Sequence, residues 1–553
     1  MKLIHNYQPI YTQKLLEMGI AQKGDGFKLS HAFQTPEHMQ FNVVTKKDGE
    51  LYSIVKEFAG SFYVDRLQGG TYYWDYPFSK EIADTYDELT DGNFLGFQLH
   101  EMGATRTYDW NRIETQLKAN NLDWTEENIY ESVKKISFNK DFPHFSQGPA
   151  GEYAILKRPK TIKEFYDDLD YVLRMRQVKT HNRVLLCDSY VMVCPLESKN
   201  NIGVSFIEIG GQNHHIRLQF ALRRGTSRAT HKKWGVYIEP WSDTEWCENP
   251  EPCTAYCFMR NGHNEWFSNP DNFVYKAEGE KGGTSMSLAR RMMYYSLFAG
   301  ADYFSEEWGQ ANTFYEWDTF EMPPYGIFKR DMAALSRRLG QVKAYAPVAI
   351  VLPKEYGMIN TSGYTLPYEN DITDGEYNEI VNRIHKLFYA GSKLGHEDGY
   401  FTTGRYGSIF DVIYEDYYEH PENEYEFLVD FSGKFAGVCD RAVNGFNEKE
   451  TITGLDQLVA EALPFTYEAS GDVDYMLFEA NGEKFICFLN HNGITKTLAN
   501  GETVNPEATV KIRAEMKASE VKEVLNICDC DFKVSDKELN AVLKGGEFIL
   551  FRL

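Results

Sequence analysis

Short apolar runs alternate with helix-like stretches over residues 1–345, and this alternation constrains the fold more than any other feature of the chain. Parallel strands joined by crossover helices give this pattern. Eight runs fit strands, at 2–6, 40–44, 62–67, 94–101, 183–190, 203–210, 234–241 and 301–308. They predict an α/β fold, a (β/α)8 TIM barrel with insertions after its fourth and seventh strands. A doubly wound open sheet is the alternative, but no strand is followed by a Gly-rich phosphate turn.

The pattern changes after residue 345. An apolar strand at 346–353, a helix at 378–395 and two further strand-like runs indicate a small α/β, Rossmann-like domain over 346–445. The last stretch, 446–553, carries Asn-Gly pairs at 481–482, 492–493 and 500–501, which favour hairpin turns. We therefore expect a C-terminal β-sandwich. Three domains suit a chain of 553 residues, because that length is too great for one core.

The charge balance excludes several classes of partner. Lys and Arg number 58 against 81 Asp and Glu, so the formal net charge is −23, which disfavours binding to nucleic acid or to an anionic membrane surface. We find no apolar run long enough for a secretory signal or a membrane span. The nine cysteines are spread along the chain in an odd number, unlike a disulfide framework. These features predict a cytoplasmic protein.

Carboxylates stand where the barrel strands are expected to end, which is where barrel enzymes carry their chemistry. The set comprises Asp65, Glu101, Asp188, Glu208, Glu239, Glu306 and Glu307, and Trp74, Trp241 and Trp308 stand nearby in the sequence. Cleavage of a glycosidic bond needs one carboxyl group to protonate the leaving oxygen and a second at the anomeric carbon, with aromatic faces to hold the sugar. The pattern therefore indicates glycoside hydrolysis on a carbohydrate substrate.

Two of the expected strands resemble those of a known family. FLGFQLHEMG (94–103) and WGVYIEPW (234–241) are similar to the fourth and seventh strands of clan A glycoside hydrolases, particularly the family 42 β-galactosidases. The resemblance implies that Glu101 is the general acid/base and Glu239 the nucleophile. It also implies a barrel, a middle domain and a small β-domain in that order, and a homo-oligomer. Clan A enzymes usually have Asn before the acid/base to bind the sugar 2-hydroxyl. Here that residue is His100, so the substrate is expected to differ from a plain β-galactoside.

Other side chains at the expected strand ends could also take part in catalysis or in binding the sugar. Glu208 precedes a Gly-Gly turn that lets backbone approach a ligand, but it is only one strand–helix unit from Glu239, so we expect it to accept a sugar hydroxyl. Strand parity places only one of Glu306 and Glu307 inside the barrel, and we expect Glu307 to contact substrate while the other pairs with an Arg outside. The remaining candidates for sugar contacts are His100, Asp188, Asn213, Trp74, Trp241 and Trp308.

No metal or cofactor is expected. Cys247, Cys253 and Cys257 have a spacing that is not a standard zinc signature, so free thiols are the preferred interpretation. The sequence thus predicts a retaining glycoside hydrolase that cleaves a small oligosaccharide or glycoside. Two alternatives stay open, a metal-assisted barrel hydrolase using Glu208, His214 and His215, and a non-catalytic sugar-binding protein on a hydrolase scaffold.

Overall fold

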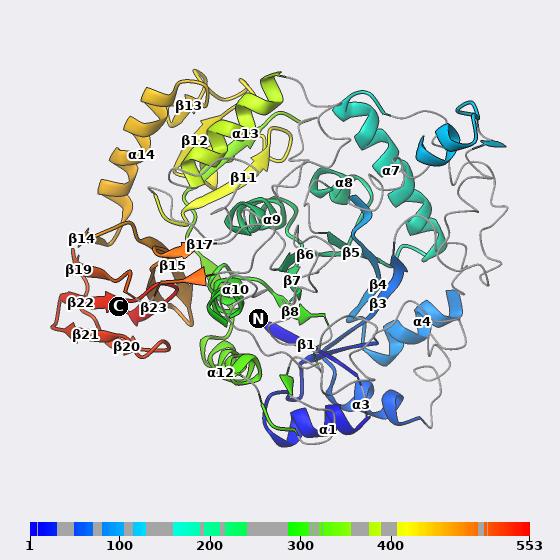
Figure 1. Ribbon diagram of the computed structural model, residues 1–553, viewed down its shortest axis with the longest axis horizontal. Helices are drawn as coiled ribbons and strands as arrows, with labels where there is room; N and C mark the ends of the chain where they lie inside the picture. Colours follow the sequence, from blue (N-terminus) through cyan, green and yellow to red (C-terminus); the bar gives the residue numbers. More distant parts are fainter. Residues whose placement is uncertain are drawn as a thin grey trace.

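The computed structural model of the chain describes residues 1–7, 9–29, 49–69, 80–103, 114–125, 127–128, 159–188, 193–210, 216–239, 286–307, 309, 313–314, 320–322, 324–354, 375–388, 406–495, 503–505 and 507–553. A closed barrel of parallel strands, in the order β1 to β8 with β8 paired to β1, forms its first part (Figure 1). The strands are β1 (Lys2–Asn6), β2 (Gly26–Leu29), β3 (Ser61–Gly69), β4 (Phe94–His100), β5 (Val184–Asp188), β6 (Val204–Gly210), β7 (Trp234–Glu239) and β8 (Tyr303–Glu306).

The predicted barrel is confirmed, but one of its strands was wrongly assigned. The run at 40–44 lies outside the described residues, and β2 is instead Gly26–Leu29. Its four residues are too few to show an alternating pattern, and Lys28 makes them look polar. The helices around the barrel are α1 (Pro9–Glu17), α3 (Glu50–Phe58), α4 (Lys80–Leu89), α7 (Ile162–Lys179), α8 (Cys194–Lys199), α9 (Ile216–Thr230), α10 (Met286–Phe298) and α12 (Pro324–Leu339).

Along the barrel strands, successive side chains point alternately into the barrel and outward toward the surrounding helices. Leu185 and Cys187 of β5 belong to a small interior cluster with Tyr63, Phe206 and Tyr237. Their neighbours along β5, β6 and β7 pack outward in the main core, and those of Tyr63 on β3 pack in a second cluster. This period of two determines which strand-end side chains can meet inside the mouth of the barrel.

The middle region contains a four-stranded parallel sheet in the order β11-β10-β12-β13. Its strands are β10 (Val348–Leu352), β11 (Phe410–Tyr414), β12 (Phe427–Asp430) and β13 (Ala442–Asn444), accompanied by α13 (Gly375–Phe388), the 3-10 turn η5 (Pro421–Asn423) and α14 (Glu448–Ala462). Every residue of β10 is buried, as expected of an apolar strand covered on both faces. α14 packs on β12 and β13.

Helix α9 is buried on all sides because it lies between the barrel and β11. A β-carbon at Gly225 would stand 2.2 Å from the Val412 carbonyl oxygen, so only glycine permits this approach. Arg224 Nε then lies 2.6 Å from Asp411 Oδ1 at the base of β11. The barrel and the middle sheet are therefore joined by close packing and by buried charge.

The C-terminal region is built from two antiparallel sheets and a short ribbon. One sheet has the order β14-β19-β22-β21 and the other β20-β23-β16-β15-β9, in which β9 comes from the end of the barrel region. The bounds are β9 (Val342–Ala344), β14 (Phe465–Ala469), β15 (Asp474–Ala480), β16 (Glu483–Leu489), β17 (Ile494–Thr495), β18 (Thr503–Val504), β19 (Val510–Met516), β20 (Glu523–Leu525), β21 (Asp531–Val534), β22 (Glu538–Leu543) and β23 (Phe548–Arg552). The predicted turn at Asn481-Gly482 is confirmed, since both residues have positive φ (51° and 78°) between β15 and β16.

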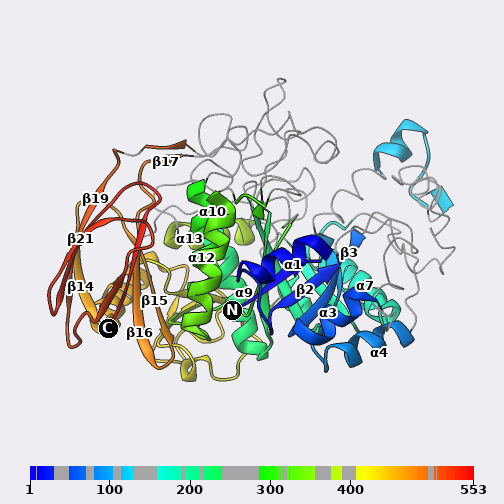
Figure 2. The same ribbon diagram turned by 90° about the horizontal axis from the view of Figure 1, so that it is seen from below.

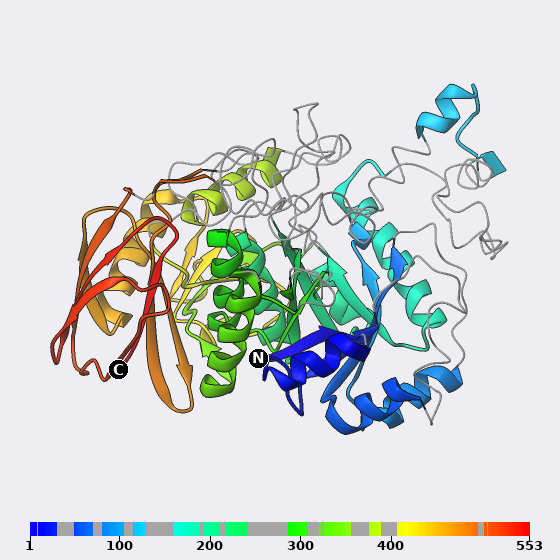
Figure 3. The same cartoon turned by 60° about the horizontal axis from the view of Figure 1, so that its bottom comes forward.

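The three regions lie side by side. Figure 2 shows the C-terminal sheets at one end, α10 and α12 beside them, and α3 and α4 of the barrel at the other end. Figure 3 shows the same order from another direction, with the sheets in orange to red and the start of the barrel in blue. The predicted boundaries at 345/346 and 445/446 stay predictions. No helix of the described ranges combines the length and apolarity that a bilayer crossing requires.

A buried ionic network lies where the three regions meet. Arg217 of α9 donates to two backbone carbonyls of the middle region, at 2.8 and 2.6 Å, and lies 3.3 Å from Asp474 of β15. Asp474 also accepts from Ser408 Oγ and faces His491 at 3.5 Å. Burial opposes ionisation of Asp474, but Arg217 and His491 hold its pKa below the usual value. Burial lowers the pKa of His491 to about 4.

Candidate active site

The mouth of the barrel rests on a buried layer of paired polar groups. Lys28 Nζ of β2 lies 2.7 Å from Asp65 Oδ2 of β3, donates to the Glu306 carbonyl at 2.7 Å and stands 4.4 Å from the centre of the Tyr237 ring. Tyr237 donates to Asp65 Oδ2 at 3.3 Å. Because Asp65 is held by Lys28 and Tyr237, it fixes the strand ends around it.

His100 lies between two carboxylates. Its Nε2 is 3.4 Å from Glu208 Oε1 on β6 and 4.0 Å from Glu101 Oε2, which follows β4. The ring meets Tyr237 edge-on at 5.7 Å. His100 and Glu208 are buried, whereas the Glu101 side chain is 36% exposed. The structure therefore brings His100, Glu101 and Glu208 together at the mouth.

Glu101 stands on a strained turn. Its φ is +47°, in the left-handed region that side chains other than glycine rarely adopt. Its amide donates to the Cys187 carbonyl at 2.7 Å, and the Gly103 amide donates to Asp188 Oδ2 at 2.7 Å. Asp188 is itself buried, so it anchors the turn that presents Glu101. Strain held in this way is typical of functional positions. Contact between Asp188 and a sugar stays a prediction.

Glu306 and Glu307 have different surroundings. Glu306 pairs with Lys329 and accepts a hydrogen bond from Tyr325 at 2.5 Å, and both partners are on α12 outside the barrel. Burial alone would lower the pKa of Lys329, but the adjacent Glu306 carboxylate raises it. The expected partner was an arginine, so that detail of the prediction is wrong. The Glu307 amide donates to the Ile238 carbonyl at 2.8 Å, and its side chain is buried.

Glu239 is the last residue of β7, in register with Gly210 of β6. Its role as the nucleophile stays a prediction. Several other predicted site residues lie outside the described residues and stay predictions, namely Trp74, Asn213, His214, His215, Trp241, Trp308, Cys247, Cys253 and Cys257.

Three residues of the mouth were missed by sequence reasoning, Lys28, Cys187 and Tyr237. Cys187 lies within 4.8 Å of both His100 and Glu208, measured between their possible metal-binding atoms. Cys187 lies one residue before the end of β5, and Tyr237 lies two residues before the end of β7. Both strands were correctly predicted, so strand parity could have identified these two side chains.

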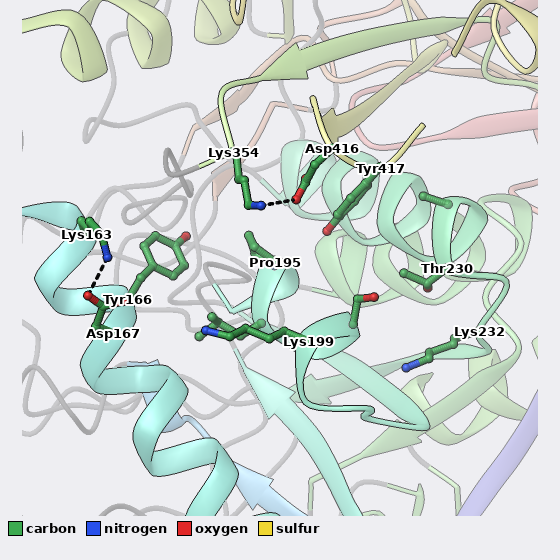
Figure 4. A pocket seen from close by; sticks show the side chains of 13 residues that line it. Lys163, Tyr166, Asp167, Pro195, Lys199, Thr230, Lys232, Lys354, Asp416 and Tyr417 are labelled. Carbon is green, nitrogen blue, oxygen red and sulfur yellow. Dashed lines mark hydrogen bonds and ion pairs between the residues drawn. The ribbon is translucent and has the colours of Figure 1, made fainter. Parts of the chain in front are cut away.

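A cavity of about 620 Å³ lies outside the barrel beside α7, α8 and the middle sheet (Figure 4). Lysines line it, but two of them are paired within it. Lys354 lies 3.3 Å from Asp416, and Lys163 lies 2.8 Å from Asp167. The strand-end glutamates are not among its lining residues in the described part of the chain. Among its described lining residues, this cavity therefore lacks the glutamates to which the sequence assigns the chemistry.

Comparison with solved structures gives full-length matches to Gan42B, a GH42 β-galactosidase from G. stearothermophilus, and to a polyextremophilic β-galactosidase from the Antarctic haloarchaeon Halorubrum lacusprofundi. The first is 8% identical with a TM-score of 0.46 and covers 100% of this chain and 98% of its own. The second is 9% identical with a TM-score of 0.38 and covers 99% of each chain. No family model matches the chain, and no curated protein matches it.

Proposed function

We propose that this chain is a retaining glycoside hydrolase, with Glu101 as the general acid/base and Glu239 as the nucleophile. The observation that carries the proposal is that both glutamates stand at carboxyl ends of strands, β4 and β7, of one closed eight-stranded barrel. Active sites of such barrels are built at this end. The retaining mechanism requires their carboxyl groups to lie about 5–5.5 Å apart.

The proposed reaction has two steps. Glu101 gives its proton to the glycosidic oxygen while Glu239 attacks the anomeric carbon, so the leaving alcohol departs and a glycosyl-enzyme ester forms. Glu101 then takes a proton from water, the resulting hydroxide attacks the same carbon, and the ester bond to Glu239 breaks. Two inversions give net retention. The strained turn held by Asp188 supports this role, because it fixes the position of Glu101.

His100 is proposed to hold a sugar hydroxyl, with Glu208 at 3.4 Å orienting the imidazole ring. The further contacts proposed for the sugar are those of Asp188, Asn213, Glu307 and the tryptophans Trp74, Trp241 and Trp308. The sugar, the cytoplasmic location and the homo-oligomer stay predictions.

The test is a panel of nitrophenyl glycosides with wild type, Glu239→Ala and a control, Glu81→Ala, at an exposed position of α4. We expect turnover in wild type and control, its loss in Glu239→Ala, and partial rescue by azide as a glycosyl azide of inverted configuration. Turnover that survives Glu239→Ala refutes the nucleophile. Glycoside binding without turnover by wild type favours a sugar-binding protein and overturns the enzymatic proposal.

A further inference from the structure

Three side chains that can bind metal converge inside the barrel from neighbouring strands. His100 of β4 is the register partner of Cys187 on β5, Cys187 is the partner of Phe206 on β6, and Glu208 stands two residues further along β6. One donor atom from each of His100, Cys187 and Glu208 lies within 4.8 Å of the others. Their exposed fractions are 8%, 0% and 1%. Imidazole nitrogen, thiol sulfur and carboxylate oxygen are thus gathered in one buried place.

The charge in this place favours a cation. A buried carboxylate such as that of Glu208 is costly unless its charge is compensated. His100 Nε2 lies 3.4 Å from Glu208 Oε1, so one ion could bind both side chains. A divalent ion at this place would be compensated by the Glu208 carboxylate and would take the sulfur of Cys187 as a further ligand.

We propose that His100, Cys187 and Glu208 bind a single transition-metal ion of the Zn²⁺ type. Sulfur, nitrogen and oxygen donors together suit Zn²⁺ better than Mg²⁺ or Ca²⁺, which prefer oxygen alone. The Cys187 thiol releases its proton to solvent when the metal–sulfur bond forms. Three protein ligands leave the fourth position of a tetrahedral site open, as in catalytic zinc sites.

The open position would lie beside the acid/base. His100 Nε2 is 4.0 Å from Glu101 Oε2, so an oxygen ligand on the metal would be a neighbour of that carboxyl group. We assign this position to the sugar hydroxyl given to His100 above, which His100 would then hold through the metal and not directly; this assignment rests on the proposed function. The metal site itself is argued only from its three ligands. A metal-binding experiment tests this site, and the glycoside panel tests the proposed function, so either proposal can fail without the other.

The experiment uses full-length protein stripped with a chelator and titrated with Co²⁺. We expect a near-ultraviolet band from charge transfer between thiolate and cobalt, its displacement by Zn²⁺, and retention of stoichiometric Zn²⁺ through gel filtration. Cys187→Ser should abolish the band and weaken binding by more than roughly 100-fold, since loss of outer-shell partners alone costs 10–100-fold. Cys194→Ser is the matched control, because Cys194 is a buried thiol on α8, outside the barrel, and should leave the band intact.

Absence of the band in wild type overturns the site, as does a band that survives Cys187→Ser. If Cys187→Ser does not fold, Glu208→Gln replaces it, since the amide keeps the size of the side chain and removes its charge. We then expect the thiolate band to persist with weakened Co²⁺ affinity, and unchanged affinity refutes the role of Glu208.

Discussion

Replacing Asp474 with asparagine should destabilise the whole molecule, because Asp474 is the counter-charge at the junction of the three regions. The Arg217 side chain there has no exposed surface, and its two donors to backbone carbonyls would remain in the variant. The substitution keeps the size of the Asp474 side chain and an acceptor for Ser408, so the main loss is charge compensation. Removing one partner of a buried ion pair costs about 3–5 kcal/mol.

The assay is urea unfolding followed by tryptophan fluorescence and by circular dichroism, read at the first cooperative transition. The control is Glu538→Gln, which removes the partner of Arg513 in a largely exposed pair with a separation of 2.7 Å. Water screens such a pair, so the control should change the unfolding free energy little. If Asp474→Asn is no more destabilising than the control, the junction does not depend on this ion pair.

Three further predictions concern the turn, the histidines and the packing of α9. Asp188→Ala removes the acceptor of the Gly103 amide, so kcat should fall by roughly 100-fold with less effect on KM, and an unchanged kcat would contradict the positioning role. Burial lowers the pKa of His385 and of His491 to about 4, from 6.5. The unfolded chain therefore binds more protons between these values, and stability should be greatest above pH 6.5 and fall by up to about 3 kcal/mol per histidine as the pH drops toward 4. Urea midpoints against pH check this, and His385→Gln should flatten the curve; an identical curve would refute the assignment. Gly225→Ala places a β-carbon against the backbone of β11 and should cost about 1–3 kcal/mol in the same unfolding assay, whereas a neutral result would show that α9 can shift without loss.

The sequence predicted those parts of the fold that depend on local pattern. Buried parallel strands read as apolar runs, and Asn481-Gly482 specifies a tight turn through its positive φ values. β2 was missed because its four residues include Lys28, a charged side chain that is buried in contact with Asp65 of β3 and with the Glu306 carbonyl of β8. A partner supplied by another strand leaves no trace in local periodicity.

The same limit applies to the candidate site. Strand ends predicted that Glu101 and Glu208 would lie at one mouth of the barrel, where both stand beside His100. The partner of Glu306 is Lys329 on a helix beyond the barrel, and it could be identified only once that helix was placed. The role of Asp188 likewise depends on a contact with the backbone of a neighbouring turn.

The central claim is that Glu239 forms a covalent bond to the sugar. The most direct measurement is inactivation by a fluorosugar analogue of the glycoside that the panel identifies, followed by peptide mass spectrometry. A retaining enzyme accumulates the glycosyl-enzyme ester with such analogues, and we predict that the label lies on Glu239 within the peptide spanning 234–241. A label on Glu208, on Glu307 or on any other residue would contradict the proposed mechanism.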